Sequence, residues 1–215
     1  MEHTTNVIIA VATVVAAIAL FVVICMDKKR ISTRSLAYGA IALALSTALS
    51  YVRLWRMPQG GSVTLASMLP IMLYSYMFGS KKGLLIGLAY AGLQSLQDLY
   101  FVHPIQFILD YPLAFASLGL VGMFRAVPPI KVKKDAYGYP IGFIAGMIAV
   151  CFIRFVCHTL SGVFFFAEYA GEQNVWAYSL GYNSFVWVEC AICILAGGLL
   201  TGNRAAMKFL FQKEL

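Results

Sequence analysis

Apolar segments of about twenty residues recur along this chain and limit what it can fold into. A helix needs about 20 apolar residues to cross the ~30 Å hydrocarbon core of a bilayer. Seven segments meet or approach this length: 6–26, 35–56, 63–79, 83–101, 105–125, 140–166 and 177–202. The chain is 61% hydrophobic and 12% charged, whereas soluble domains carry about 25% charged residues. The sequence therefore predicts an all-α integral membrane protein in a lipid bilayer.

The basic residues give the expected orientation. They lie between apolar segments and not in one patch, which argues against nucleic-acid binding despite the net charge of +7. If the loops alternate between the two sides, one side collects Lys28, Lys29, Arg30, Arg34, Lys81, Lys82, Arg125, Lys131, Lys133, Lys134, Arg204, Lys208 and Lys213. The other side has Arg53 and Arg56. Cytoplasmic loops are enriched in Lys and Arg, so we expect a multi-pass cell-membrane protein with its N-terminus outside and its C-terminus in the cytoplasm.

The first apolar segment differs from the rest in its flanks. The basic cluster follows it instead of preceding it, which is typical of a signal anchor and not of a cleaved signal peptide. We expect residues 1–31 to form an accessory N-terminal transmembrane helix and residues 32–215 to form a six-helix core.

Polar residues inside the apolar segments are the main candidates for a site, because charges in a bilayer are costly. With the expected orientation, several of them lie at similar heights near the outer face: Asp98, Tyr100, Asp110, Tyr111, Arg154, His158, Tyr178 and Asn183. The inner half is almost purely apolar apart from Glu189. An aqueous path through the membrane would need polar lining at all depths. The pattern instead favours a site loaded from outside.

Arg154 and His158 are four residues apart and therefore share one helix face. Two interpretations are open: they pair across helices with Asp110 or Glu189, or they line a pocket. The two are compatible, because Arg154 can orient an acceptor that then contacts a ligand. Asp110 likewise forms either a salt bridge to Arg154 or a ligand contact. Together with the outer aromatic residues, the carboxylates Asp98, Asp110, Glu168 and Glu172 could form a cage for a flat cation.

The second apolar segment, 35–56, contains a stripe of small residues at four-residue spacing: Ala40, Ala44 and Ala48. Small residues at this spacing let helices pack closely in lipid. The stripe faces either the bundle of this chain or the helix of a partner.

Motifs that would indicate enzymes are absent from the sequence. It contains no G-x-x-x-x-G-K-[ST], no H-E-x-x-H and no G-x-S-x-G. The pair Cys190–Cys193 has no second Cys/His pair to complete a zinc site. We therefore expect no enzyme activity, no metal and no cofactor, and a solute-binding core that depends on an ion gradient or on a partner.

Three stretches resemble the thiamine-specific S components, the ThiT/YuaJ family, of energy-coupling-factor (ECF) vitamin transporters. They are MPQGGSVTLASMLPI (57–71), QDLYFVHPIQFILDYPLAFASLGLVGMFR (97–125) and RFVCHTLSGVFFFAEYA…WAYSLGYNS (154–184). The resemblance implies high-affinity thiamine binding by a six-helix core. It also implies docking on an ECF transmembrane coupling subunit that carries two cytoplasmic ATPase subunits, through the stripe Ala40, Ala44 and Ala48.

The resemblance also implies which residues bind the substrate. They are Tyr100, Asp110, Tyr111, Arg154, His158, Phe166, Tyr178 and Asn183. In this reading, Asp110 holds the aminopyrimidine edge, His158 lines the pocket and Arg154 supports the acid.

The chain departs from the family pattern at three places. Phe166 stands where the family has a ring-stacking Trp, Asp110 is one methylene shorter than the usual Glu, and the first-loop Trp has no counterpart within 60–67. Three alternatives therefore stay open: an S component for another vitamin or a thiamine precursor, a solitary ion-coupled transporter that uses Asp110, His158 and Glu189, and a structural or signalling membrane protein.

Overall fold

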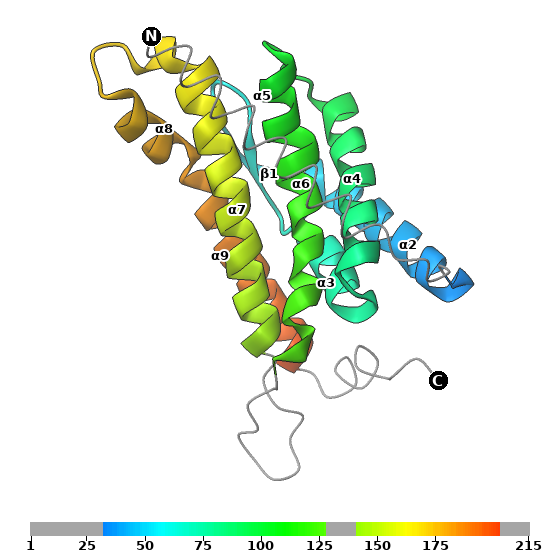
Figure 1. Ribbon diagram of the computed structural model, residues 1–215. Helices are drawn as coiled ribbons and strands as arrows, with labels where there is room; N and C mark the ends of the chain where they lie inside the picture. The colour runs from blue at the N-terminus through cyan, green and yellow to red at the C-terminus, as the bar shows by residue number, and fades with distance from the viewer. Residues whose placement is uncertain (1–31, 128–140, 203–215) are drawn as a thin grey trace.

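A computed structural model describes residues 32–127 and 141–202, which form a helical bundle with one short β-hairpin beside it (Figure 1). The helices are α2 (Thr33–Ser50), α3 (Leu69–Phe78), α4 (Ser80–Gln97), α5 (Pro104–Ile108), α6 (Ala114–Ala116), α7 (Ile141–Phe165), α8 (Val175–Asn183) and α9 (Phe185–Gly202). A π-helical turn (Leu109–Leu113) joins α5 to α6, and 3-10 helices span Ser117–Ala126 and Ala167–Ala170. The predicted helix at 6–26 lies outside the described residues.

Three helices in the described ranges are long and apolar enough to cross a membrane: Pro104–Ala126, Ile141–Phe165 and Val175–Leu200. Their outward surfaces are apolar, as shown by Leu195 and Leu199 on α9, which are 70% and 81% exposed. Large exposed apolar surfaces are unfavourable in water and favourable in lipid. The chain is therefore a largely helical membrane protein, as the composition predicted.

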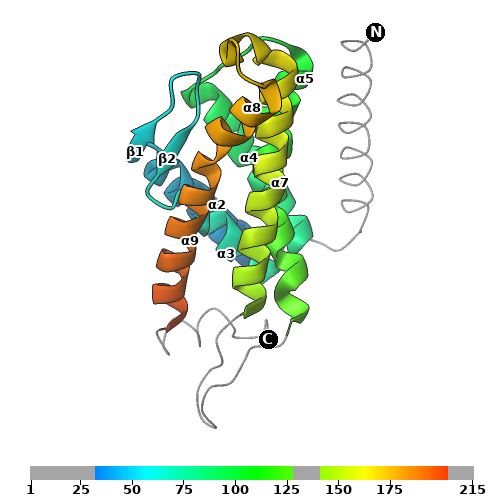
Figure 2. The same ribbon diagram turned by 90° about the vertical axis from the view of Figure 1, so that its left-hand side faces the viewer.

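The segment predicted as one helix over 35–56 divides into a helix and a strand. Helix α2 ends at Ser50, and β1 (Arg53–Arg56) pairs antiparallel with β2 (Ser62–Thr64). The turn between the strands contains Gly60 and Gly61 at φ 89° and 82°, a backbone region that favours glycine. The predicted helix over 35–56 was therefore too long at its end, and the largely helical fold also contains this short hairpin, which Figure 2 shows beside the bundle.

The predicted helix at 63–79 is also shorter than expected. Residues 62–64 form strand β2, and α3 begins only at Leu69, with Pro70 in its first turn. Proline is tolerated there because the N–H groups of the first turn have no intrahelical acceptor.

The segment predicted as 105–125 is continuous but irregular. Pro112 lies within it, and a proline removes one backbone donor and its ring displaces the carbonyl four residues earlier. The backbone widens into the π-helical turn at this point, and Asp110 lies in that turn. Such turns are frequent at functional sites.

The segment predicted as 177–202 divides at Ser184 into α8 and α9. The amide nitrogen of Asn183 donates to the backbone oxygen of Ser179 (2.9 Å) and to that of His158 on α7 (3.3 Å). The break thus lies where α8 is tied to α7.

The core lies between α3, α4, α7, α9 and the 3-10 helix Ser117–Ala126, with buried side chains that include Met68, Ile71, Met72, Tyr90, Leu118, Phe143 and Met147. Glycine allows a close approach at Gly87 on α4, where an added Cβ would lie 2.6 Å from the backbone oxygen of Phe115. The contact draws α4 onto the segment that carries Asp110.

Candidate functional site

A cavity of ≈ 160 Å³ opens near the end of the bundle where α4 and α7 finish and α5 and α8 begin. A single water needs about 10–15 Å³ measured in the same way, so the cavity has room for a small organic molecule. All eight residues predicted to bind substrate line it: Tyr100, Asp110, Tyr111, Arg154, His158, Phe166, Tyr178 and Asn183. Their roles toward a ligand remain predictions.

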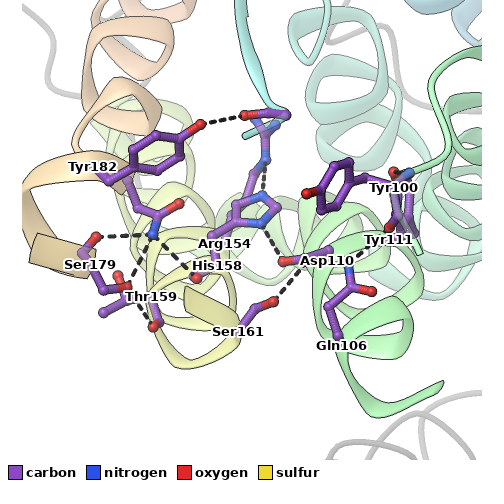
Figure 3. Close-up of polar contacts among 12 residues, drawn as sticks. Tyr100, Gln106, Asp110, Tyr111, Arg154, His158, Thr159, Ser161, Ser179 and Tyr182 are labelled. Carbon is purple, nitrogen blue, oxygen red and sulfur yellow. Dashed lines mark hydrogen bonds and ion pairs between the residues drawn. The ribbon is translucent and has the colours of Figure 1, made fainter. Parts of the chain in front are cut away.

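Asp110 is held by three donors (Figure 3). The Oδ1 atom lies 2.9 Å from Nδ1 of His158, while Oδ2 accepts from Nε2 of Gln106 and from Oγ of Ser161, both at 2.7 Å. A carboxylate has about four acceptor positions, so capacity remains for a further donor from a ligand.

The tautomer of His158 follows from its two contacts. Nε of Arg154 donates to Nε2 of His158 at 3.2 Å. Since a guanidinium only donates, Nε2 is the unprotonated nitrogen and Nδ1 carries the hydrogen that Asp110 receives. His158 is therefore a neutral donor to Asp110, fixed in orientation by Arg154.

Arg154 does not form the salt bridge to Asp110 that was one interpretation of the sequence. Its Nη1 pairs instead with Oε2 of Glu189 at 2.7 Å, and the two side chains are 6% and 1% exposed. The reason is geometric: His158 lies between Arg154 and Asp110 and contacts both. Arg154 therefore supports Asp110 indirectly, through His158.

Aromatic side chains form much of the remaining wall. The rings of Tyr100 and Phe166 lie 5.5 Å apart, and those of Tyr178 and Tyr182 stack at 6.0 Å. The hydroxyl of Tyr100 also lies 3.2 Å from that of Tyr169. This hydrogen bond raises the pKa of Tyr169 above its ordinary value. Electron-rich faces beside Asp110 suit a flat cation.

Two predicted site residues use their polar atoms within the protein. The hydroxyl of Tyr111 donates to the backbone oxygen of Asp98 (2.7 Å) and accepts from the backbone N–H of Tyr100 (2.9 Å). The amide nitrogen of Asn183 is likewise engaged by α7 and α8. Both residues therefore shape the wall of the cavity and hold its neighbours in place.

Several lining residues were not predicted. Gln106 precedes Asp110 by four residues and Ser161 follows His158 by three, which are helical spacings that could have indicated both. The hairpin turn gave no such signal. There, the hydroxyl of Tyr182 accepts from the backbone N–H of Gln59 (2.8 Å) and donates to the oxygen of Gly60 (3.0 Å).

The predicted carboxylate cage is only partly present. Asp98 lines the cavity, but Arg53 pairs with it at 2.8 Å. Glu168 and Glu172 are exposed and lie outside the lining. The acid without a cationic partner in the described lining is thus Asp110, whose histidine partner is neutral.

The small-residue stripe on α2 faces away from the described bundle. Ala40, Ala44 and Ala48 are exposed, whereas the opposite face of α2 is buried through Ser35, Gly39, Ala42, Ser46 and Ser50. Of the two interpretations, packing of the stripe within the described part of this chain is excluded.

Comparisons with known proteins all point to one family. Residues 36–208 match the family described as Thiamine transporter protein (Thia_YuaJ). The chain is 36% identical over 161 residues to Thiamine transporter ThiT of Bacillus subtilis (strain 168), which covers 69% of this chain and 83% of that protein. It is 36% identical over 107 residues to ThiT of Lacticaseibacillus paracasei, which covers 46% of this chain and 52% of that protein.

A solved structure of ThiT from Listeria monocytogenes has the same fold, with a TM-score of 0.64 and 22% identity over 83% of this chain and 94% of that one. Transport and not enzyme chemistry is what the family match indicates. Because the family match spans most of the sequence and the Bacillus relative covers more than two thirds of it, this chain belongs to the Thia_YuaJ family of thiamine transporter proteins.

Proposed function

We propose that this chain binds thiamine from the outer side of the cell membrane and serves as the capture component for its uptake. The observation that carries this proposal is Asp110, which His158, Gln106 and Ser161 hold at one end of an aromatic-lined cavity. Thiamine combines a hydrogen-bonding aminopyrimidine with a cationic thiazolium ring. The free acceptor capacity of Asp110 suits the aminopyrimidine donors, and the aromatic rings suit the cation.

The relatives support the same substrate. The Bacillus and Lacticaseibacillus proteins are both described as thiamine transporters. We extend that substrate to this chain because the residues expected to bind thiamine line one cavity and because Asp110 lacks a cationic partner there.

Coupling to an ECF transmembrane subunit and its two ATPase subunits is the second part of the proposal. The sequence contains no phosphate-binding loop of its own, so energy has to come from elsewhere. The exposed stripe of Ala40, Ala44 and Ala48 offers a surface for close packing against a partner helix. In this arrangement residues 32–215 form the six-helix core and residues 1–31 an additional helix, with the N-terminus outside and the C-terminus inside.

The test is calorimetric titration of thiamine into the purified, detergent-solubilised protein. Trp55, Trp176 and Trp187 lie outside the cavity lining, so the intrinsic fluorescence of tryptophan is a secondary readout. We expect saturable binding that Asp110→Asn weakens at least about 100-fold, since the new amide places a donor where three donors converge.

The matched control is Glu172→Gln, which removes the same charge at an exposed position outside the cavity and should bind as the unmodified protein does. Absence of thiamine binding by folded protein would overturn the proposal and direct the search to thiamine precursors and other vitamins. Uptake into liposomes driven by a proton gradient alone would instead favour the solitary ion-coupled transporter.

A further inference from the structure

Glu189 is a buried carboxylate that lies outside the cavity lining and is 1% exposed. Its Oε2 atom accepts from Nη1 of Arg154 at 2.7 Å, and its Oε1 atom accepts from the hydroxyls of Thr64 and Ser67. Each oxygen is thus engaged by donors, which offsets the cost of burying a carboxylate.

Arg154 connects this acid to the cavity. Its guanidinium lies 4.8 Å from the ring of Phe115 and donates to Nε2 of His158 at 3.2 Å. The residue as a whole is 5% exposed. His158 in turn contacts Asp110 at 2.9 Å. The four side chains therefore form one continuous series of contacts from Glu189 to Asp110.

The charges along this series of contacts define which acid is available to a ligand. Arg154 and Glu189 cancel, His158 is neutral in the geometry described above, and Asp110 is left with one negative charge. Without the charge of Glu189, the buried guanidinium would have no carboxylate partner. The nearest other carboxylate in the series of contacts is that of Asp110. An unpaired buried cation is strongly unfavourable, so Arg154 would compete with a cationic ligand for that acid.

We infer that Glu189 is a positioning residue: by neutralising Arg154 it reserves Asp110 as the counter-ion of a monocationic ligand. The inference rests on the proposed function, since it concerns the same cavity. It adds that a residue without ligand contact decides how strongly the site distinguishes a cation from a neutral molecule of the same shape.

The experiment compares two ligands on the same protein sample: thiamine, and an uncharged analogue in which carbon replaces the quaternary ring nitrogen. Their affinities are measured by calorimetry in unmodified protein and in Glu189→Gln. Glutamine keeps the size of the side chain and its acceptor oxygen but loses the charge. We expect thiamine affinity to fall about tenfold or more and affinity for the neutral analogue to change less than about threefold. A purely structural role would lower both affinities together.

The double variant Arg154→Met/Glu189→Gln removes both charges, so no unpaired buried cation competes with the ligand for Asp110. Replacing a buried ion pair by uncharged side chains of similar size is often tolerated, so this protein should fold even if Glu189→Gln does not. Both ligands should bind more weakly to it, because His158 loses the Arg154 donor that orients it. The ratio of thiamine to neutral-analogue affinity should nevertheless return to within about threefold of that of the unmodified protein. Glu172→Gln, an exposed charge removal, should leave the ratio unchanged.

The outcomes separate this inference from the proposed function. If the unmodified protein does not bind thiamine, both fall. Two results would overturn only the role of Glu189 in a protein that binds thiamine. One is an unchanged affinity ratio in Glu189→Gln, and the other is a ratio in the double variant that stays as low as in the single variant.

Discussion

The contact between Asp110 and His158 depends on what each nitrogen of the His158 ring meets. Nδ1 of His158 is the nitrogen that reaches Asp110, because Arg154 takes Nε2. The contact partner of each ring nitrogen decides which one carries the hydrogen. Substitutions that imitate one nitrogen or the other should therefore differ in effect.

We predict that His158→Asn retains more thiamine affinity than His158→Gln. The amide nitrogen of asparagine occupies the place of Nδ1 and can still donate to Asp110, whereas that of glutamine extends toward the place of Nε2 and meets the Arg154 guanidinium. The difference should be at least about tenfold, since a hydrogen bond to a charged group contributes about 1.5–3 kcal/mol. Calorimetric titration of both variants measures it, and an equal loss in both would contradict the assigned tautomer.

Phe166 permits a gain-of-affinity test. Its ring lies 5.5 Å from that of Tyr100 in the cavity wall, and the family resemblance assigns this position to a stacking Trp. Since indole binds cations better than a phenyl ring does, Phe166→Trp should raise thiamine affinity about two- to tenfold, and Phe166→Leu should lower it. The new Trp also provides a fluorophore within the cavity, so thiamine should quench it; failure to quench would place the ligand elsewhere.

The sequence could predict a contact only where the two residues lie at helical spacing on the same helix. The pair Arg154 and His158 follows from a four-residue interval, and Gln106 could have been found in the same way from Asp110. For the partner of Arg154, the sequence left two candidates, Asp110 and Glu189, and could not choose between them. Arg154 and Glu189 each lie twelve residues from the outer ends of their predicted spans, which puts them at equal depth, but depth does not say which helix faces meet.

At the scale of the elements, the close contact of α4 with the segment 114–126 positions the π-helical turn that carries Asp110. We predict that Gly87→Ala destabilises the protein by about 1–3 kcal/mol, because its Cβ would lie 2.6 Å from a backbone oxygen that cannot swing away. Gly92→Ala in the same helix meets nothing within 4 Å and should be neutral or stabilising by up to ~1 kcal/mol, since alanine favours helix.

Thermal unfolding in detergent, with and without thiamine, measures both glycine variants. Equal melting temperatures for Gly87→Ala and Gly92→Ala would mean that the close contact does not limit stability.

Irregular elements were the hardest to predict. Strands β1 (RLWR) and β2 (SVT) mix polar and apolar residues and are only four and three residues long, so the predicted helices, drawn from average hydropathy, extended across them. The glycine pair at 60–61 marks a turn, but the strands on either side are stabilised by pairing with each other and by Tyr182 from α8. Contacts between distant segments do not leave a local pattern.

At the scale of the whole molecule, the cavity and the small-residue stripe belong to different surfaces. The cavity is lined mainly by α4, α5, α7, α8, the π-helical turn and the hairpin, and by no residue of α2, whereas the stripe lies on the outer face of α2. In Figure 1, α2 is set at an angle to the long helices α7 and α9. Substrate binding and partner docking should therefore be separable by mutation.

We predict that Ala44→Leu leaves thiamine binding within about threefold of the unmodified protein and reduces uptake at least about tenfold, because a larger side chain prevents close helix approach. Binding is measured by calorimetry on the isolated protein, and uptake in thiamine-requiring cells that supply the ECF partner subunits. The matched control is Ala191→Leu, which enlarges an exposed alanine on a different helix, α9. It should preserve both thiamine binding and uptake. Normal uptake by Ala44→Leu would exclude the stripe as the docking surface. Loss of uptake in both variants would indicate instead that any enlargement of the lipid-facing surface is harmful.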